Sequence, residues 1–281
     1  MPKYLLRVIS LATLGAALAG CGADTDARPT AGPSPGPASR QPAGPERPAV
    51  TPVFLRGADP AGTTGAVTAA KTVALTFDAD MTADQGPRAA RGERFDNPTL
   101  ISSLRRLEVP STIFMTGRWV EEYPFQAREI GSDPLFEVAN HSYSHHSFTA
   151  DCHGLKALGE KDMAADVERA FGAFRKAGVR QVVPYFRFPG GCYDRSTLRT
   201  LAPAGLTAVQ WDVVSGDAFA TDADTVAEQV LADVRPGSVV VMHCTMSAAP
   251  VTDEAVRKIV PVLRERGYRF VKVSELIKGP S

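Results

Sequence analysis

An alternation of short apolar runs with helical segments is the feature that most limits what this chain can fold into. Helical periodicity is clearest over 97–107 and 161–177, and a third helix is expected from Asp253, as its N-cap, to Gly267. Strands that alternate with helices form parallel sheets, and seven or eight of them favour a closed barrel over an open sheet. We therefore predict an α/β fold with a parallel barrel of about seven strands. The predicted strands are 72–77, 111–115, 135–139, 183–187, 207–211, 238–242 and 269–273.

Polar residues with acid–base or metal-binding chemistry stand directly after several of these strands. In α/β barrels the loops after the carboxyl ends of the strands carry the chemistry. Placing so many charged groups at one rim would be costly in a purely structural domain. The sequence therefore predicts one site, made of Asp78 and Asp80 after the first strand, His141 and His145 after the third, Arg187 at the end of the fourth, Asp212 and Asp217 after the fifth, and His243 after the sixth.

The histidines are clustered, which is unusual for core residues. His141 and His145 are spaced so that, on a helical turn, both side chains could reach one metal ion. A pair of surface histidines is the alternative interpretation. With a nearby carboxylate, the two imidazoles would form an open site suited to Zn²⁺. His146 and His153 are left without a role.

Residues 1–20 have the features of an export signal. Lys3 and Arg7 precede an apolar run that is too short to span a bilayer, and the segment contains no acidic residue. Residues 18–21 resemble the lipobox at which bacterial signal peptides are cut and Cys21 receives lipid. We therefore predict an exported lipoprotein, anchored to the membrane through Cys21 and facing the cell envelope. An ordinary cleavage site followed by an incidental cysteine is the alternative.

Residues 21–55 are expected to form a disordered linker, because eight of the 22 prolines lie between Pro29 and Pro52. A segment with so few large apolar groups cannot offset the entropy of ordering. A partner-binding PxxP segment is the alternative. The remaining residues, 56–281, are expected to be the catalytic domain.

The folded region contains three cysteines, Cys152, Cys192 and Cys244. At most one disulfide can form among them, and each lies within about nine residues of a predicted site residue. One pair would therefore brace the site, and the spacing leaves open which pair this is.

Five segments, in their order and spacing, resemble the motifs of the polysaccharide deacetylases. These are metal-dependent carbohydrate esterases of family 4 type that share the nodulation-protein-B homology domain. The resemblance covers about residues 70–275 and implies a distorted (β/α) barrel that holds a divalent metal, usually zinc, and hydrolyses N-acetyl or O-acetyl groups on glycans. The segments are Thr76-Phe77-Asp78-Ala79-Asp80, His141-Ser142-Tyr143-Ser144-His145, Arg187-Phe188-Pro189-Gly190-Gly191, 211–217 and Val241-Met242-His243.

The resemblance also implies a role for each matching residue. Asp78 matches the general base that takes a proton from water, and Arg187 matches the cation that orients this base. His141 and His145 match metal ligands. The family usually has two adjacent aspartates in the first motif, and the second is a ligand. Here Ala79 stands in that place, and we hypothesise that Asp80 supplies the ligand through a shifted loop.

His243 matches the general acid that protonates the leaving group, and Asp217 matches the carboxylate that polarises this histidine. A backbone N–H near Gly190 would stabilise the oxyanion. Pro189 and Trp211 are expected to contribute to substrate binding.

Further departures from the family pattern concern the surroundings of these groups. Gly190 stands where a tyrosine is usual, which removes an aromatic wall. Val214 and Ala218 replace a usual aspartate and tryptophan. Asp212 is therefore an alternative to Asp217 as the partner of the histidine.

The charge balance restricts the substrate. The chain has 31 basic and 31 acidic residues, so it lacks the basic footprint of a nucleic-acid binder. We expect a monomer that deacetylates an N-acetylated envelope polysaccharide, and the predicted location favours peptidoglycan. Chitin-like glycans and O-acetylated xylan are alternative substrates, and hydrolysis of another C–N bond, such as that of a cyclic amide, is an alternative reaction. A catalytically silent glycan-binding protein is a further alternative, motivated by Ala79, Val214 and Ala218.

The lipid anchor can be tested by substitution at Cys21. Processing of a tagged chain should be sensitive to globomycin and should be blocked in Cys21→Ala, because lipid transfer to the thiol precedes cleavage at a lipobox. Unchanged processing of the variant, followed on a denaturing gel, would show ordinary signal cleavage instead.

Overall fold

The computed structural model describes residues 48–58 and 71–279. The predicted export signal, Cys21 and most of the predicted linker therefore lie outside the described residues. Within the described part, none of the helices combines the length and the apolar character needed to cross a membrane.

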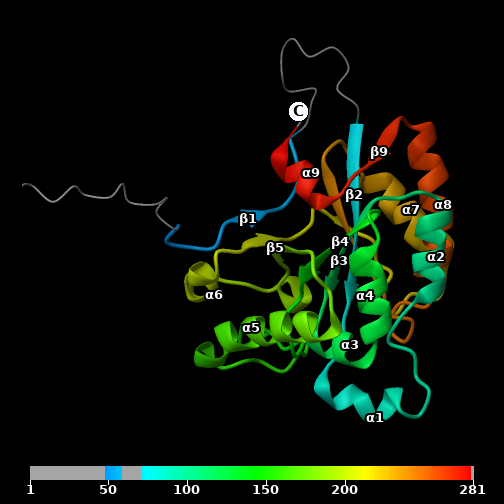
Figure 1. The fold of residues 1–281 in the computed structure, drawn as a ribbon. Helices are drawn as coiled ribbons and strands as arrows, with labels where there is room; N and C mark the ends of the chain where they lie inside the picture. Colours follow the sequence, from blue (N-terminus) through cyan, green and yellow to red (C-terminus); the bar gives the residue numbers. More distant parts are fainter. Residues whose placement is uncertain (1–47, 59–70, 280–281) are drawn as a thin grey trace, which may run out of the picture. The chain divides into compact units, whose positions relative to one another are not determined.

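The described strands form a single parallel sheet, in which the longest strand lies near the middle (Figure 1). They are β1 (Val53–Phe54), β2 (Lys71–Ala79), β3 (Ser111–Met115), β4 (Phe136–Asn140), β5 (Val182–Phe186), β6 (Thr207–Val209), β7 (Val213–Val214), β8 (Ser238–His243) and β9 (Tyr268–Phe270). The order is β1-β6-β5-β4-β3-β2-β8-β7, and β9 pairs with the start of β2. No pairing among the described residues joins β7 to β1, so the sheet is a curled half-barrel, the distorted barrel that the resemblance implied.

All seven predicted strands are present, and the described sheet contains two more. β1 and β7 have only two residues each, which is too short for a periodic pattern to appear in the sequence. β1 pairs with β6 through Val53 and Phe54. The folded part of the chain therefore reaches into the segment that was expected to be linker.

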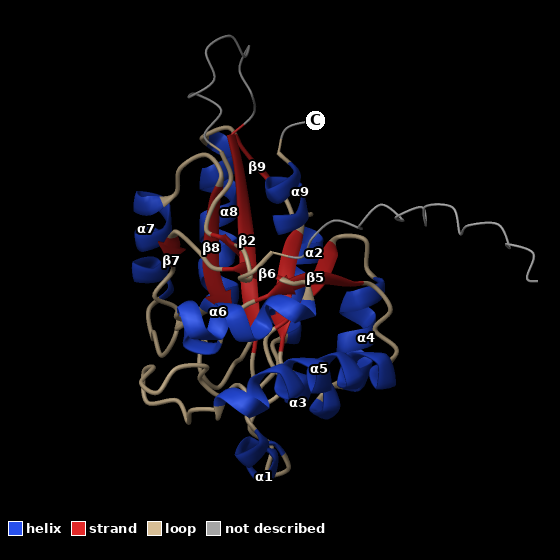
Figure 2. Cartoon of the chain, turned by 90° about the vertical axis from the view of Figure 1, so that its left-hand side faces the viewer, coloured by secondary structure: helices blue, strands red, loops and turns tan. Residues whose placement is uncertain are grey.

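Helices and turns connect the strands, and α7 and α8 lie side by side in both views (Figures 1 and 2). The helices are α1 (Gly86–Ala89), α2 (Pro98–Arg106), α3 (Gly117–Glu122), α4 (Pro124–Ser132), α5 (Glu160–Ala177), α6 (Arg195–Leu201), α7 (Ala223–Asp233), α8 (Thr252–Glu265) and α9 (Val273–Lys278). Short 3₁₀ turns span Ala83–Gln85, Pro189–Gly191 and Ala202–Ala204.

Two predicted helices are confirmed as α2 and α5. The side chain of Asn97 accepts a hydrogen bond from the backbone N–H of Leu100 and so caps α2. Gly178, in the left-handed conformation, ends α5. The predicted N-cap at Asp253 was wrong, because α8 already begins at Thr252 and Asp253 lies in its first turn. An acidic side chain there still stabilises the helix, because it faces the positive end of the helix dipole.

The alternation of side chains along β2 separates two apolar clusters. Leu75, Phe77 and Ala79 belong to the larger core, which packs between the sheet and the helices. Ala74 points to the other face, where a smaller cluster takes one residue from each of β2, β3, β4, β5, β6 and β8. This smaller cluster therefore fills the concave face of the half-barrel. Asp78 has the same parity as Ala74 and is expected to point to that concave face, at the carboxyl end of the strand.

Candidate active site

The carboxyl ends of neighbouring strands carry the predicted site residues. Asp78 is next to last in β2 and is in register with His243, the last residue of β8. Asp80 follows β2, His141 follows β4 and Arg187 follows β5. Since all the pairings are parallel, these ends meet at one edge of the sheet.

Asp78 and Arg187 form a buried ion pair. Nη1 of Arg187 donates a hydrogen bond of 2.7 Å to Oδ1 of Asp78. Nε of Arg187 donates to the carbonyl oxygen of Val209, and the guanidinium lies 3.9 Å from the centre of the Phe114 ring. Burial lowers the pKa of the guanidinium, and the attraction of Asp78 opposes this change. The pair fixes the orientation of the carboxylate and leaves Oδ2 to face other groups.

His141 lies against this second oxygen. Its Nε2 is 3.6 Å from Oδ2 of Asp78, and its Nδ1 is 2.9 Å from the backbone carbonyl oxygen of Arg187. A carbonyl can only accept, so Nδ1 carries the proton and Nε2 carries the lone pair. Burial lowers the pKa of His141 to about 4, although Asp78 opposes this shift. At neutral pH the imidazole is therefore uncharged, with its lone pair directed toward the carboxylates.

Asp80 and His145 form a second pair. Nε2 of His145 lies 3.5 Å from Oδ2 of Asp80. Burial lowers the pKa of His145, with Asp80 opposing. For Asp80, burial raises the pKa, but His145, His243 and a hydrogen bond from Thr245 together hold it below its usual value of 3.8. The carboxylate is thus charged and the imidazole neutral, which are the states that a metal ion requires of its ligands.

The two histidines do not share a helical turn, contrary to the prediction. The segment from His141 to His145 is an irregular loop, in which Ser142 (φ 69°) and His145 (φ 56°) have left-handed backbones. The carboxylate of Asp166, in α5, accepts a hydrogen bond of 2.8 Å from the backbone N–H of Tyr143 and so holds the loop. The two imidazole rings still come together, with centres 5.0 Å apart in a T-shaped arrangement.

Strand geometry explains how Asp80 reaches the site. β2 continues through Ala79, which is in register with Met115 of β3 and whose side chain is fully buried in the larger core. Because side chains alternate along a strand, Asp80 returns to the side of Asp78. A carboxylate at position 79 would point into apolar packing, whereas one at position 80 faces His145. β2 therefore carries position 79 into the core and returns position 80 to the side of Asp78.

Asp217 and His243 form the third pair. Oδ1 of Asp217 lies 2.8 Å from Nδ1 of His243, and Oδ2 accepts the backbone N–H of His243 and the hydroxyl of Thr252. Burial raises the pKa of Asp217, but His243 and these hydrogen bonds outweigh it and lower the pKa below 3.8. Burial likewise lowers the pKa of His243, and the attraction of Asp217 reverses this and raises it to about 10. His243 is therefore protonated at neutral pH.

Asp212 does not share this role. Its carboxylate accepts hydrogen bonds from the backbone N–H of Val239 and the hydroxyl of Ser238, at the start of β8. His243 is the last residue of the same strand, about 16 Å away at 3.3 Å per residue. Asp212 therefore stabilises the opposite end of the strand.

The turn after Arg187 packs closely against its neighbours. Gly190 (φ 67°) and Gly191 (φ 74°) both have left-handed backbones. A Cβ atom at Gly191 would lie 2.5 Å from the Trp211 ring, and one at Gly190 would lie 2.6 Å from the sulfur of Cys152. Of the three residues expected to contact substrate, Pro189 is buried, and Gly190 and Trp211 are half-buried.

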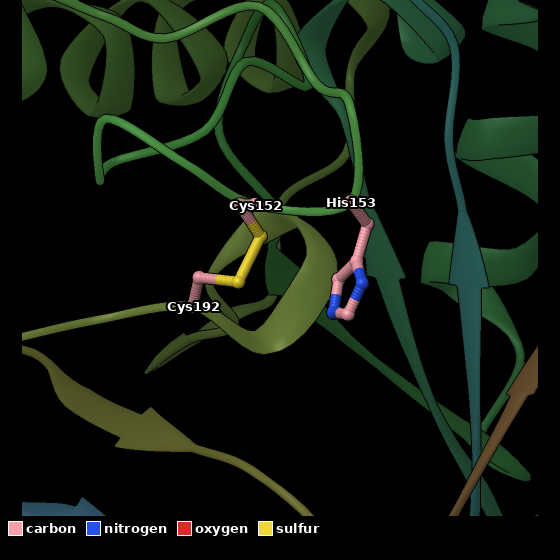
Figure 3. A group of neighbouring side chains, drawn as sticks. All are labelled: Cys152, His153 and Cys192. Carbon is pink, nitrogen blue, oxygen red and sulfur yellow. A yellow bond between two sulfur atoms is a disulfide. The ribbon is translucent and has the colours of Figure 1, made fainter.

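A disulfide joins Cys152 to Cys192 and ties the loop after the histidines to the turn after Arg187. Figure 3 shows His153 beside it. Ligand atoms of these three residues lie within 4.8 Å of one another, and among the described residues no other histidine, cysteine or acidic trio is as close. Sulfurs bonded to each other offer no thiolates, so we assign no metal to this trio. Cys244 is free and buried, and burial raises its pKa to about 12.

The donor set of Asp80, His141 and His145 fits a divalent cation. Two neutral imidazoles and one carboxylate are ligands that Zn²⁺ accepts, and they leave further positions open. The 3.5 Å between Oδ2 of Asp80 and Nε2 of His145 is close to the separation of about 3.3 Å expected for two tetrahedral ligands with bonds of about 2.05 Å. His141 instead faces Asp78, at 3.6 Å, and the centre of its ring lies 5.0 Å from that of His145. The ligand atoms of these three residues therefore do not all lie within 4.8 Å of one another.

Sequence reasoning missed several residues that hold the site. Thr245 and Thr252 each donate to a site carboxylate, and Asp166 holds the histidine loop. Thr245 stands two residues after His243, so the rule that identified the strand ends could have included it. The sequence near Thr252 and Asp166 contains no comparable signal, because both lie in helices.

Two solved structures with a similar fold are both described as members of carbohydrate esterase family 4. A CE4 family pseudoenzyme from Bacillus anthracis is 24% identical, with a TM-score of 0.62 over 80% of this chain and 68% of that chain. A family 4 acetyl xylan esterase from Clostridium thermocellum, in complex with a cobalt ion, is 23% identical, with a TM-score of 0.60 over 75% of this chain and 93% of that chain. Both likenesses support the fold described above.

Sequence relatives are consistent with these structures. A chitooligosaccharide deacetylase from Sinorhizobium fredii is 31% identical over 72% of this chain and 89% of its own length. A peptidoglycan-N-acetylglucosamine deacetylase from Bacillus cereus is 26% identical over 74% of this chain and 89% of its own length. Residues 65–209, about half of the chain, match the polysaccharide deacetylase family itself. As the sequence motifs predicted, this chain belongs to the polysaccharide deacetylase family of hydrolases.

Proposed function

We propose that the chain removes acetyl groups from an N-acetylated envelope polysaccharide, with peptidoglycan as the substrate. One observation carries this proposal. Asp78, held by a cation, and His243, protonated at neutral pH, are in register on adjacent strands. A proton acceptor and a proton donor at one rim are what hydrolysis of an amide needs, because water must lose a proton and the leaving nitrogen must gain one.

The family uses a divalent metal, and we propose that Asp80, His141 and His145 hold a zinc ion in this chain. A zinc ion there would supply Lewis acidity, which polarises the acetyl carbonyl and lowers the pKa of water. The support is the donor set: one charged carboxylate beside two imidazoles whose pKa values are lowered by burial.

Asp78 serves as the general base. Arg187 occupies its Oδ1, so Oδ2 is the oxygen that accepts the proton from the attacking water. The same hydrogen bond prevents the carboxylate from rotating. Because Arg187 is fully buried and stacked on Phe114, it keeps its position as the proton is transferred.

His243 serves as the general acid. Its Nδ1 is bonded to Asp217, so Nε2 is the nitrogen from which the leaving amine takes its proton. About a quarter of the His243 side chain is exposed, whereas Asp217 is buried. The acid therefore meets the substrate while its partner stays away from water, where the charge pair is stronger.

The choice of substrate combines the similar relatives with the predicted location. The relatives described above are named for chitooligosaccharide and peptidoglycan deacetylation. A lipid-anchored protein facing the cell envelope, as residues 1–21 indicate, would meet peptidoglycan first. The near-neutral chain is compatible with a glycan that carries little charge, and we propose that it acts as a monomer.

A catalytically silent glycan-binding protein remains the second candidate. The observation that favours it is the similarity to a CE4 family pseudoenzyme, together with Ala79 in the place of a usual aspartate. Against it, Asp80 lies beside His145, and the Asp78–Arg187 and Asp217–His243 pairs are intact.

Acetate release separates the two candidates. We expect the zinc-loaded domain to release acetate from peptidoglycan, and to do so faster than from chitin oligomers or acetylated xylan. Asp78→Asn should lower kcat by at least about 100-fold, because the amide cannot accept the proton. The exposed Asp224→Asn is a matched control and should keep full activity. Binding without release from any of the three glycans, with zinc or cobalt, would support the silent protein.

The ligand role of Asp80 is tested by metal content. Asp80→Asn should weaken zinc affinity by more than about 100-fold, since losing a charged ligand should cost more than losing an outer hydrogen bond. The measurement is competition with a chromophoric chelator. The control is Asp84→Asn, which changes the next aspartate along the chain, an exposed residue. Equal zinc affinity in Asp80→Asn would remove Asp80 from the ligand set.

The protonation of His243 should depend on Asp217. In the metal-free wild type, NMR titration should show His243 protonated up to a pH of about 10. In Asp217→Asn, burial still lowers the pKa of His243 and only the weaker attraction of Asp80 and Asp78 opposes it. The pKa should therefore fall well below 10, and less of the ring should be protonated at pH 8. Activity at pH 8 should fall accordingly. A His243 resonance that titrates near pH 10 in both proteins would contradict this account.

A further inference from the structure

The two oxygens of Asp80 have different partners. Oδ1 accepts a hydrogen bond of 2.6 Å from the hydroxyl of Thr245, and Oδ2 faces Nε2 of His145 at 3.5 Å. Thr245 is buried, with 2% of its surface exposed, and lies two residues beyond the end of β8. It therefore reaches Asp80 from the loop that follows the strand carrying His243.

We propose that Thr245 is the positioning residue that allows the displaced carboxylate of Asp80 to bind the metal. By occupying Oδ1, the hydroxyl directs Oδ2 toward His145 and the cation. This inference rests on the proposed function, because it assumes that Asp80 is a ligand.

The need for such a residue follows from where β2 ends. The ladder between β2 and β3 stops at Ala79, and the ladder between β2 and β8 stops at Asp78. Asp80 is thus one residue beyond the last paired position. Thr116 holds the backbone on both sides of it, through the carbonyl oxygen of Ala79 and the N–H of Met81, but makes no hydrogen bond to the N–H of Asp80 itself. That N–H donates instead to the hydroxyl of Thr245 at 3.4 Å. The hydroxyl of Thr245 therefore contacts both the N–H and the carboxylate of Asp80.

The chemistry of a hydroxyl suits this double contact. A threonine hydroxyl has one proton to donate and lone pairs to accept with. Thr245 donates to the carboxylate and accepts from the amide, so the two bonds do not compete.

The structural contribution of Thr245 lies in its backbone and can be separated from its side chain. Its carbonyl oxygen accepts hydrogen bonds from the backbone N–H groups of Ala248 and Ala249, which close the following turn. Thr245→Val keeps the branched shape and this backbone but removes the hydroxyl. Thr245→Ser keeps the hydroxyl.

Thr252 provides a reference within the same site. Its hydroxyl donates 2.7 Å to Oδ2 of Asp217, and it is as buried as Thr245. Thr252→Val therefore removes the same kind of bond from the carboxylate that pairs with His243 and leaves Asp80 untouched.

The experiment measures zinc affinity of the metal-free protein by competition with a chromophoric chelator. We expect Thr245→Val to bind zinc about 10- to 100-fold more weakly than the wild type, the range found when outer hydrogen bonds to ligands are removed. Thr245→Ser should bind nearly as tightly as the wild type. Thr252→Val should keep the wild-type affinity for zinc. Circular dichroism and thermal unfolding check that each variant folds.

The other outcomes are also decisive. Wild-type affinity in Thr245→Val, or an equal loss in Thr252→Val, would overturn the positioning role. If Thr245→Val does not fold, Thr245→Ala provides the same test. The proposed function fails separately, when the wild type binds no zinc or when Asp80→Asn binds it as tightly as the wild type.

Discussion

The parallel pairing of β2 with β8 is the constraint on which the rest of the site depends. It places Asp78 and His243 at neighbouring positions, at a strand spacing of about 4.8 Å, before any side chain makes a contact. Backbone hydrogen bonds and the apolar clusters on both faces of β2 maintain this register. Hydrogen bonds with Arg187 and Asp217 then orient the side chains of Asp78 and His243.

Each carboxylate of the site accepts a hydrogen bond from a buried side chain, and this bond sets the direction in which its oxygens point. Asp78 uses Arg187 in this way, Asp80 uses Thr245, and Asp217 uses His243 and Thr252. Burial alone would raise the pKa of Asp80 and of Asp217 and so favour their neutral forms. The donors oppose that penalty and also restrict rotation, so that charge and orientation are set by the same hydrogen bonds. The imidazoles are oriented in the same way. The carbonyl of Arg187 binds Nδ1 of His141 and the carboxylate of Asp217 binds Nδ1 of His243, so Nε2 is the free nitrogen of both rings.

Much of the fold could be predicted because long apolar strands leave a clear periodic pattern in the sequence. All seven predicted strands are present, and the residues after them meet at one edge. Features with no local pattern were not predictable. Two-residue strands are too short to repeat, and the pairing of Cys152 with Cys192 depends on loops 40 residues apart. The spacing of His141 and His145 predicted a helical turn, and it was wrong because contacts from Asp166 and left-handed backbones hold an open loop instead.

The edge strand β1 also determines how the domain would respond to mechanical load. A pull on the chain ahead of residue 48 would reach the fold first at Thr51, whose N–H donates to the carbonyl oxygen of Leu198, and then at β1, which pairs with β6 at one end of the strand order. β2 and β8 lie farther along that order and share none of these bonds. The two-residue ladder of β1 would separate from β6 before the longer ladder between β2 and β8 opens. Loss of β1 under such a pull would leave the pairing of Asp78 with His243 in place.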